Sequence, residues 1–177
     1  MSHTIDDDVI ITGDLTVDGR FDAAGRSHVR AYNTATQTFT AGATSVAVIL
    51  DTEIYDTQNE WASNRFTNNS GYTKTYLVNF RVYPGVMASG EIIEVYMSPN
   101  ISGTGISAST VHGYTEMIYY IHSFDSDNAR IYMSGTIRLL DTEWFEVGLF
   151  FGGTSTHAIG DAGGRTDLQA VLDITEF

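Results

Sequence analysis

Histidines and carboxylates are the side chains of this sequence that could bind a metal ion or exchange protons. His112 and Glu116 are four residues apart, and on a helix this spacing would place both on one face as metal ligands. The surrounding residues read as a strand, where the two would share a side but lie about 13 Å apart. His122 would lie on the same side of the strand, but too far from His112 and Glu116 to bind the same ion. The remaining histidines make no HxH, HxxxH or HxxE grouping; they are His3, His28 and His157.

The segment Asp125-Ser-Asp127-Asn128 begins like a calcium-binding loop. Ala129 and Arg130 then replace the next ligand and the turn glycine, so a hairpin turn explains the segment better. The acidic run Asp6–Asp8 is typical of a solvated terminus, although it could bind a cation or a basic patch on a partner. No G-x-S-x-G or G-x-x-x-x-G-K motif occurs. The sequence therefore predicts no catalytic residue, no metal site and no cofactor site, and the protein is not expected to be an enzyme.

Composition excludes several classes of partner. The 177 residues include 22 acidic and 9 basic side chains, and the net charge of −13 should repel nucleic acid and anionic membrane surfaces. Cysteine is absent, which excludes disulfides and thiolate-metal sites. The acidic N-terminus is no signal peptide, and no apolar run approaches the ~20 residues of a membrane span. We expect a soluble protein made in a cytoplasm, with one main domain and a real core.

Residues 65–83 show how the elements are patterned. Apolar side chains recur there at every second position: Tyr72, Tyr76, Val78, Phe80 and Val82. Lys74 is the only interruption, so this period of two predicts one long strand with a buried face.

Shorter alternating runs recur along the chain between Gly, Asn, Asp and Ser, and helical periodicity is hard to find. The expected strands are Val29–Asn33, Ser45–Leu50, Tyr72–Tyr83, Glu91–Ser98, Tyr114–Ser123, Ala129–Leu139, Glu143–Phe151 and Leu168–Phe177. Pro84 and Pro99 are expected just past strand ends. The fold class is therefore predicted to be all-β, an antiparallel sandwich or barrel.

The first residues differ from the rest. Residues 1–26 are predicted to form a short β-structured attachment segment, separate from a main domain at 27–177. Its apolar residues share one register: Val9, Ile11, Leu15, Val17 and Phe21. A two-stranded piece of this size cannot bury its apolar face alone. We expect it to pack against copies of itself or against another protein; the alternative is an extra strand pair on the main sandwich.

The order of segments along residues 27–177 is informative. An opening strand at 30–33 is followed by the connection 51–66, by Gly71-Tyr72 with its long strand, and by a hairpin at 134–147. This order resembles the C1q/TNF-like jelly roll, especially the versions in bacterial and bacteriophage surface proteins. The proline that the family has shortly before the Gly-Tyr pair is replaced here by Asn68-Asn69-Ser70. The resemblance implies a jelly-roll sandwich that assembles as a symmetric homotrimer and serves in binding, assembly or display.

Aromatic residues support assembly independently of the resemblance. Ten tyrosines and nine phenylalanines exceed what one small core needs. Tyr119 and Tyr120 are adjacent, so in a strand one ring must face outward, and Tyr83 and Tyr132 also fall opposite an apolar face. Aromatic side chains on both faces favour a second surface buried between subunits. The alternative is a two-layered fold with half-exposed tyrosines.

The leading hypothesis for function is a bacteriophage virion protein. It would be a trimeric jelly roll that decorates a capsid or forms a compact head-fibre knob. Its N-terminal segment, which resembles the collars of phage fibre and decoration proteins, would anchor it to a capsid, fibre or tail protein. It would lie on the virion surface after synthesis in the host cytoplasm.

Two other functions compete with this hypothesis. One is a receptor-binding head of a tail or surface fibre, in which the loop aromatics Tyr55, Trp61 and Tyr114 contact a host-surface glycan. Trp61 could equally lie in the core. The other is a cupin-like or lytic enzyme, and the missing metal ligands argue against it.

Overall fold

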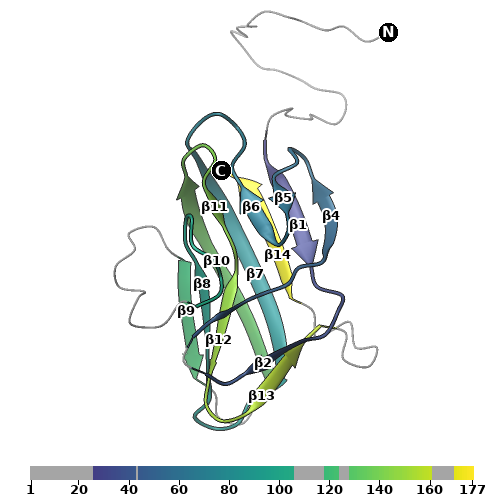
Figure 1. Ribbon diagram of the computed structural model, residues 1–177, viewed down its shortest axis with the longest axis vertical. Coiled ribbons are helices and arrows are strands. Elements are labelled where there is room, and N and C mark those ends of the chain that lie inside the picture. The colour runs from purple at the N-terminus through teal and green to yellow at the C-terminus, as the bar shows by residue number, and fades with distance from the viewer. Residues whose placement is uncertain (1–25, 43, 106–117, 124–127, 161–169) are drawn as a thin grey trace, which may run out of the picture.

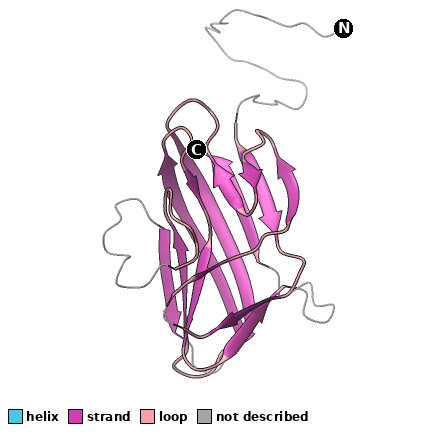
Figure 2. Cartoon of the chain, viewed as in Figure 1, coloured by secondary structure: helices cyan, strands magenta, loops and turns pink. Residues whose placement is uncertain are grey.

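Strands and loops make up the part of the chain that the computed structural model describes, which is residues 26–42, 44–105, 118–123, 128–160 and 170–177 (Figures 1 and 2). The strands are β1 (His28–Tyr32), β2 (Gln37–Thr40), β3 (Val46–Ala47), β4 (Thr52–Asp56), β5 (Trp61–Ala62), β6 (Arg65–Thr67), β7 (Lys74–Val86), β8 (Ile92–Met97), β9 (Ile118–Ser123), β10 (Asn128–Leu139), β11 (Trp144–Phe145), β12 (Gly148–Gly152), β13 (Thr156–Ile159) and β14 (Val171–Glu176). These ranges contain no helix that could cross a membrane.

The largest sheet has five antiparallel strands in the order β10-β7-β14-β1-β4 (Figure 1). Its longest pairing joins β10 to β7, from Leu139 opposite Lys74 to Asn128 opposite Val86. The last strand, β14, lies between β7 and β1 and pairs with both. Strands from the two ends of the described chain therefore lie side by side.

A second sheet of four strands, in the order β3-β12-β8-β9, completes the sandwich, with smaller sheets β11-β6-β5 and β13-β2 beside it. One continuous apolar core joins the two large sheets. It includes Val78 and Phe80 of β7, Ile93 and Val95 of β8, and Leu149 of β12, all of them buried. The structure is therefore the all-β antiparallel sandwich that the sequence predicts.

Along β7 the alternation of apolar residues in the sequence corresponds to a buried row of side chains. Tyr76, Val78, Phe80 and Val82 are each at most 1% exposed, as predicted. Tyr72 is different: it precedes the strand and is 74% exposed, so its predicted place in the buried row is wrong. The reason is that the backbone before β7 turns around Asn68, whose side-chain amide binds the Tyr72 carbonyl at 2.7 Å and also the carbonyls of Leu139 and Leu140.

Pro84 lies inside β7, which corrects its predicted place beyond the strand end. Val82 pairs with Ile131 and Gly85 pairs with Ala129, so Tyr83 and Pro84 together stand opposite Arg130. This is a β-bulge, where a proline without an N–H group is tolerated. The extra residue also changes which way the next side chains point, and it turns Val86 outward.

Two other predicted strands are shorter than expected. Of the range 45–50 only β3 is a strand, and the range 143–151 is divided into β11 and β12. At this division the carbonyl of Val147 accepts a hydrogen bond from the Val48 N–H at 2.8 Å, outside any regular ladder. Strands β2, β4, β5, β6 and β13 were not predicted, because each has only two to five residues. Pro99 follows the end of β8, as expected.

Candidate interaction surface

The residues predicted to contact a ligand do not form one exposed patch. Trp61 is 9% exposed and packs in the core, the second of the two places expected for it, so little of its ring is open to a sugar. Tyr55 is half-buried and already hydrogen-bonded. Tyr114 and the five apolar residues of the N-terminal segment lie outside the described residues; these are Val9, Ile11, Leu15, Val17 and Phe21. Their predicted roles stay predictions.

The candidate metal ligands give a similar result. His112 and Glu116, together with Asp125 and Asp127, lie outside the described residues. Within the described ranges, no group of three or more His, Cys, Asp or Glu side chains is placed to hold a metal ion.

The most distinctive surface is the outward side of the five-stranded sheet, which we call the outer face. Val86 of β7 is 69% exposed and Tyr132 of β10 is 60% exposed, and both project from it. Ile54 is exposed on β4, at the opposite edge of the same sheet. Leu140 and Phe177 continue the outward rows of β10 and β14 past the strand ends, at the end of the sheet away from Val86. Single exposed apolar side chains are ordinary, but several of them along one face of a sheet are typical of an interaction surface.

Arginines accompany these apolar side chains. Strand alternation turns Arg30, Arg81, Arg130 and Arg138 to the outer face, so it holds four of the chain's nine basic residues. Asp173 of β14 lies among them. The outer face is thus positive, although the whole chain has a net charge of −13.

Two tyrosines are coupled at the bulge. The hydroxyls of Tyr83 and Tyr132 are hydrogen-bonded, and their rings meet edge to face with centroids 5.8 Å apart. The guanidinium of Arg130 lies 5.7 Å from the centre of the Tyr83 ring. This pairing of aromatic and guanidinium groups is the composition that protein interfaces favour.

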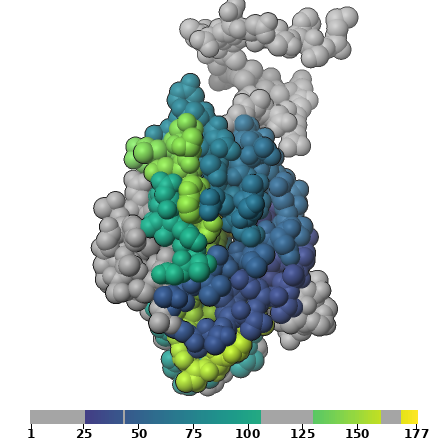
Figure 3. Space-filling view, viewed as in Figure 1, coloured from purple at the N-terminus to yellow at the C-terminus, as the bar shows by residue number. Residues whose placement is uncertain are grey.

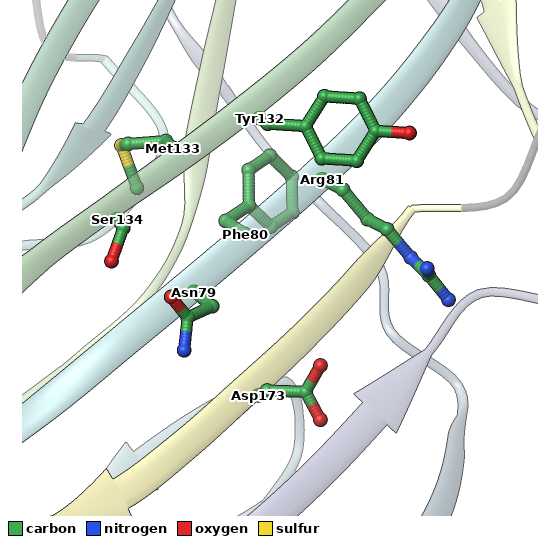
Figure 4. Close-up of a pocket in the computed structure, with 7 residues that line it drawn as sticks. All are labelled: Asn79, Phe80, Arg81, Tyr132, Met133, Ser134 and Asp173. Carbon is green, nitrogen blue, oxygen red and sulfur yellow. The ribbon is translucent and has the colours of Figure 1, made fainter.

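Two hollows on the outer face share Arg81. One, of about 290 Å³, is lined by side chains of three strands, among them Asn79, Tyr132 and Asp173 (Figure 4). Figure 4 shows the Arg81 side chain extending from β7 toward β14. The other hollow, of about 380 Å³, is lined by Arg30, Tyr32, Ile54, Arg81 and Val171. The face is therefore uneven, with room for side chains of a partner.

A hydrogen-bonded network occupies the side of the outer face nearest β4. Arg30 forms an ion pair with Asp173 at 3.0 Å. The Tyr55 hydroxyl contacts Nε2 of His28 at 3.0 Å and donates to Asp173 at 3.5 Å. Burial and the neighbouring Asp173 carboxylate raise the pKa of Tyr55. This network holds β4, β1 and β14 together, and it uses the tyrosine that the sequence suggested as a ligand contact.

Sequence reasoning missed a buried carboxyl group, that of Glu60, which is 2% exposed. One of its oxygens accepts hydrogen bonds from Ser27 at 2.8 Å and from the Tyr76 hydroxyl at 3.4 Å. The other oxygen, Oε2, has no partner among the described residues. Burial first, and then the nearby Asp56, raise the pKa of Glu60, against the opposing effects of Ser27 and Lys74.

Glu60→Gln should make the protein more stable than the wild type at pH 8 but not at pH 4. Because the folded-state pKa of Glu60 lies above its ordinary value of 4.5, the folded protein holds this proton more tightly than the unfolded chain does. As pH rises through the folded-state pKa, the carboxyl group ionises and stabilises the folded protein less, whereas glutamine stays neutral. Urea unfolding of both proteins from pH 4 to pH 8 measures the difference.

Asp141→Asn is the matched control, because Asp141 is exposed and the change again replaces a carboxylate by an amide. That variant should follow the wild-type pH dependence. A Glu60→Gln variant that is equally destabilised at every pH would contradict a raised pKa of Glu60.

A second buried carboxyl group, Glu91, is ionised. One of its oxygens lies 3.2 Å from Nε2 of His157, and its carboxylate accepts the N–H groups of Ala88 and Ser155 at 2.7 and 3.1 Å. Hydrogen bonds from Ser155, followed by those of Ala88 and the charge of His157, outweigh burial and lower the pKa of Glu91 to about 2. Glu91 thus fastens the loop before β8 to the loop before β13, which is a structural role.

Comparisons with known proteins address the fold. No protein-family model matches the sequence, and no curated protein matches it either. Among solved structures, the globular domain of the zebrafish complement 1qA protein superposes with a TM-score of 0.50 and 13% identity, over 85% of this chain and 96% of that one. The Eiger TNF structure from S. frugiperda gives a TM-score of 0.46 and 8% identity, over 86% and 91% of the two chains. At these identities the likeness concerns the fold alone: the chain has the jelly-roll fold of the C1q globular domain.

Proposed function

We propose that this protein is a non-enzymatic assembly and display domain. It forms a homotrimer through the outer face and lies on a virion surface, as a capsid decoration or a compact head-fibre knob held by its N-terminal segment. The outer face is the observation that carries this proposal. Contact with other copies of the chain would bury the exposed apolar side chains of this face. These side chains are Val86, Tyr132, Ile54, Leu140 and Phe177.

The fold supports an assembly of three subunits. C1q and TNF domains are typically trimeric, and this chain has their architecture. When every subunit uses the same contact and the ring closes, the assembly has a fixed number of subunits. A trimer covers the outer face of every subunit while the loops at the ends of the sandwich stay available for display.

The virion location has its support in the N-terminal segment. Residues 1–25 carry the apolar register described above, and a short two-stranded piece needs a partner to cover such a face. A capsid, fibre or tail protein is the partner we propose for it. The attachment is tested by sedimenting virus particles from cells that make either the full chain or residues 26–177; only the full chain should travel with the particles.

The purified full chain should have a mass of ~58 kDa in sedimentation equilibrium, three times the 19.4 kDa of one chain. Val86→Glu should weaken this association by at least about tenfold, because it places a carboxylate in the interface we propose. Val46→Glu is the matched control, since Val46 is also exposed but lies on the four-stranded sheet. A wild-type monomer at micromolar concentration would refute the trimer, and equal effects of the two variants would refute the outer face as its interface.

A further inference from the structure

Charge is distributed unequally across the five-stranded sheet. Residues 74–86, which form β7, contain Lys74 and Arg81 and no acidic residue. Residues 128–140, which include β10, contain Arg130 and Arg138 and again no acidic residue. These two strands are neighbours at one edge of the sheet. Lys74 pairs with the buried Leu139 and binds Glu176, so the charged residues that β7 and β10 contribute to the outer face are Arg81, Arg130 and Arg138, all of them basic in a chain with a net charge of −13.

The opposite edge is acidic. Residues 31–64 contain no lysine or arginine, and they carry Asp51, Glu53, Asp56 and Glu60. Strand β4, which lies in this range, forms the other edge of the sheet and is at the right of Figure 1. On the same side of the molecule in Figure 3 the surface is coloured blue, which marks this part of the chain. The sheet thus has a positive edge at β10 and a negative edge at β4.

Glu53 is the acidic residue of this edge that is available to a partner. Asp51 accepts hydrogen bonds from the backbone N–H groups of Thr34 and Ala35, and Glu60 is buried. Asp56 accepts the backbone N–H of Trp61 at 2.7 Å. Glu53 is exposed, and its carboxylate is within ion-pair distance of no described cation. The exposed Ile54 follows it and lies on the other side of the edge strand, because Glu53 pairs with the buried Ala31 whereas Ile54 lines a hollow of the outer face.

The basic edge offers matching groups. Arg81 is exposed between the two hollows of the outer face, and no described carboxylate is within ion-pair distance of it. Arg130 is exposed at the edge strand, with the apolar side chains of Tyr132 and Val86 close to it along the sheet. An acidic side chain with an apolar neighbour is complementary to this surface in both respects.

A three-fold assembly requires two different patches on each subunit. In a cyclic trimer every contact is head to tail, so patch A of one copy meets patch B of the next. We propose that the acidic edge of one subunit, Glu53 and Ile54 of β4, packs on the basic part of the next subunit's outer face, around Arg81 and Arg130. This inference rests on the proposed homotrimer and names the contact that closes it.

Charge exchange tests this contact. Arg81→Glu, Arg130→Glu and Glu53→Lys are each expected to weaken trimer association by about tenfold at low salt, as measured by sedimentation over a dilution series. Adding Glu53→Lys to Arg81→Glu or to Arg130→Glu should restore association to within about threefold of the wild type for at least one of the two pairs. The effect of each single change should shrink in 1 M NaCl, where the Debye length is about 3 Å.

A control separates the contact from the effect of net charge. Thr38→Glu with Thr40→Glu adds two negative charges at exposed positions of β2, the same change in charge as Arg81→Glu, and should leave association unchanged. Glu53→Lys makes the chain less negative, so general repulsion cannot explain a loss of association in that variant.

The outcomes distinguish this inference from the proposed function. If the wild-type chain is a monomer, the trimer fails and the contact fails with it. If the wild type is a trimer but neither charge exchange restores association, or the single changes have no effect, the trimer stands and the edge-to-face contact is overturned. Restoration by either exchange supports the contact.

Discussion

Asn68→Ala should lower the free energy of unfolding by about 4 kcal/mol, because it removes a hydrogen-bonding centre from the interior. Asn68 is 0% exposed. Its amide nitrogen donates to the carbonyls of Tyr72, Leu139 and Leu140 at 2.7, 3.1 and 3.0 Å. Its amide oxygen accepts from the Ser70 hydroxyl at 2.7 Å and from the Tyr76 hydroxyl at 2.9 Å.

These bonds join two hairpins that are distant in sequence. The backbone of Asn68 adds to them, since its N–H donates to the Glu143 carbonyl at 2.9 Å and its carbonyl accepts the Thr142 N–H at 2.7 Å. Alanine would keep the two backbone bonds but leave several buried groups without a partner, each at a cost of about 1–3 kcal/mol. The cost falls short of the full sum because the loop can partly relax.

Asn69→Ala is the matched control for this prediction. Asn69 is exposed, and its side chain makes one hydrogen bond, to the Asn59 carbonyl at 3.3 Å. That variant should stay within about 1 kcal/mol of the wild type. Urea unfolding at one fixed protein concentration is the measurement, because assembly adds to apparent stability. An Asn68→Ala variant as stable as the Asn69→Ala variant would contradict the central role of this side chain.

Gly148→Ala is the second change with a large expected effect, a loss of about 3 kcal/mol or more. A methyl group at Gly148 would stand 2.3 Å from the carbonyl oxygen of Gly103, and one at Gly103 would stand 2.5 Å from the carbonyl oxygen of Val147. Both obstacles are backbone atoms, which cannot rotate away as a flexible side chain can. Relief therefore requires the loop before residue 105 to move away from the start of β12.

The control for Gly148 is Gly42→Ala. The nearest atom to a methyl group there is the Thr40 carbonyl oxygen at 3.6 Å, an ordinary van der Waals distance. Replacing a glycine without strain reduces the entropy of the unfolded chain, so Gly42→Ala should be neutral or stabilising by up to about 1 kcal/mol. Thermal and urea unfolding compare the two variants, and a Gly148→Ala protein that is no less stable than Gly42→Ala would disprove the close contact.

Alternation along the sequence was a reliable guide wherever a strand is long. The apolar positions from Tyr76 to Val82 are buried, and so are Phe145, Val147, Leu149 and Phe151, although the strand itself is interrupted between β11 and β12. A period of two follows from the geometry of a single strand, so it needs no knowledge of the neighbours. This is why the all-β class and the core of β7 could be predicted.

Local exceptions could not be predicted, since each depends on a neighbour. Pro84 is accommodated only because Arg130 on β10 faces two residues of β7. Tyr72 is turned outward by the bonds around Asn68, whose partners at 139 and 140 are about seventy residues away in sequence. The burial of Trp61 likewise depends on the core that other strands build.

Local patterns along the chain are enough to predict the fold class, the buried rows of the long strands and the excess of acidic charge. They also contain one unused signal for the candidate site, two strand-length segments at 74–86 and 128–140 that have basic but no acidic residues. The pairing of the strands in the folded protein is what makes these segments neighbours and puts β4 at the opposite edge of the same sheet. Strand order arises from pairing between residues that are far apart in sequence, such as His28 with Thr175, and no local pattern encodes it. The outer face and its two charged edges therefore became visible only in the folded chain.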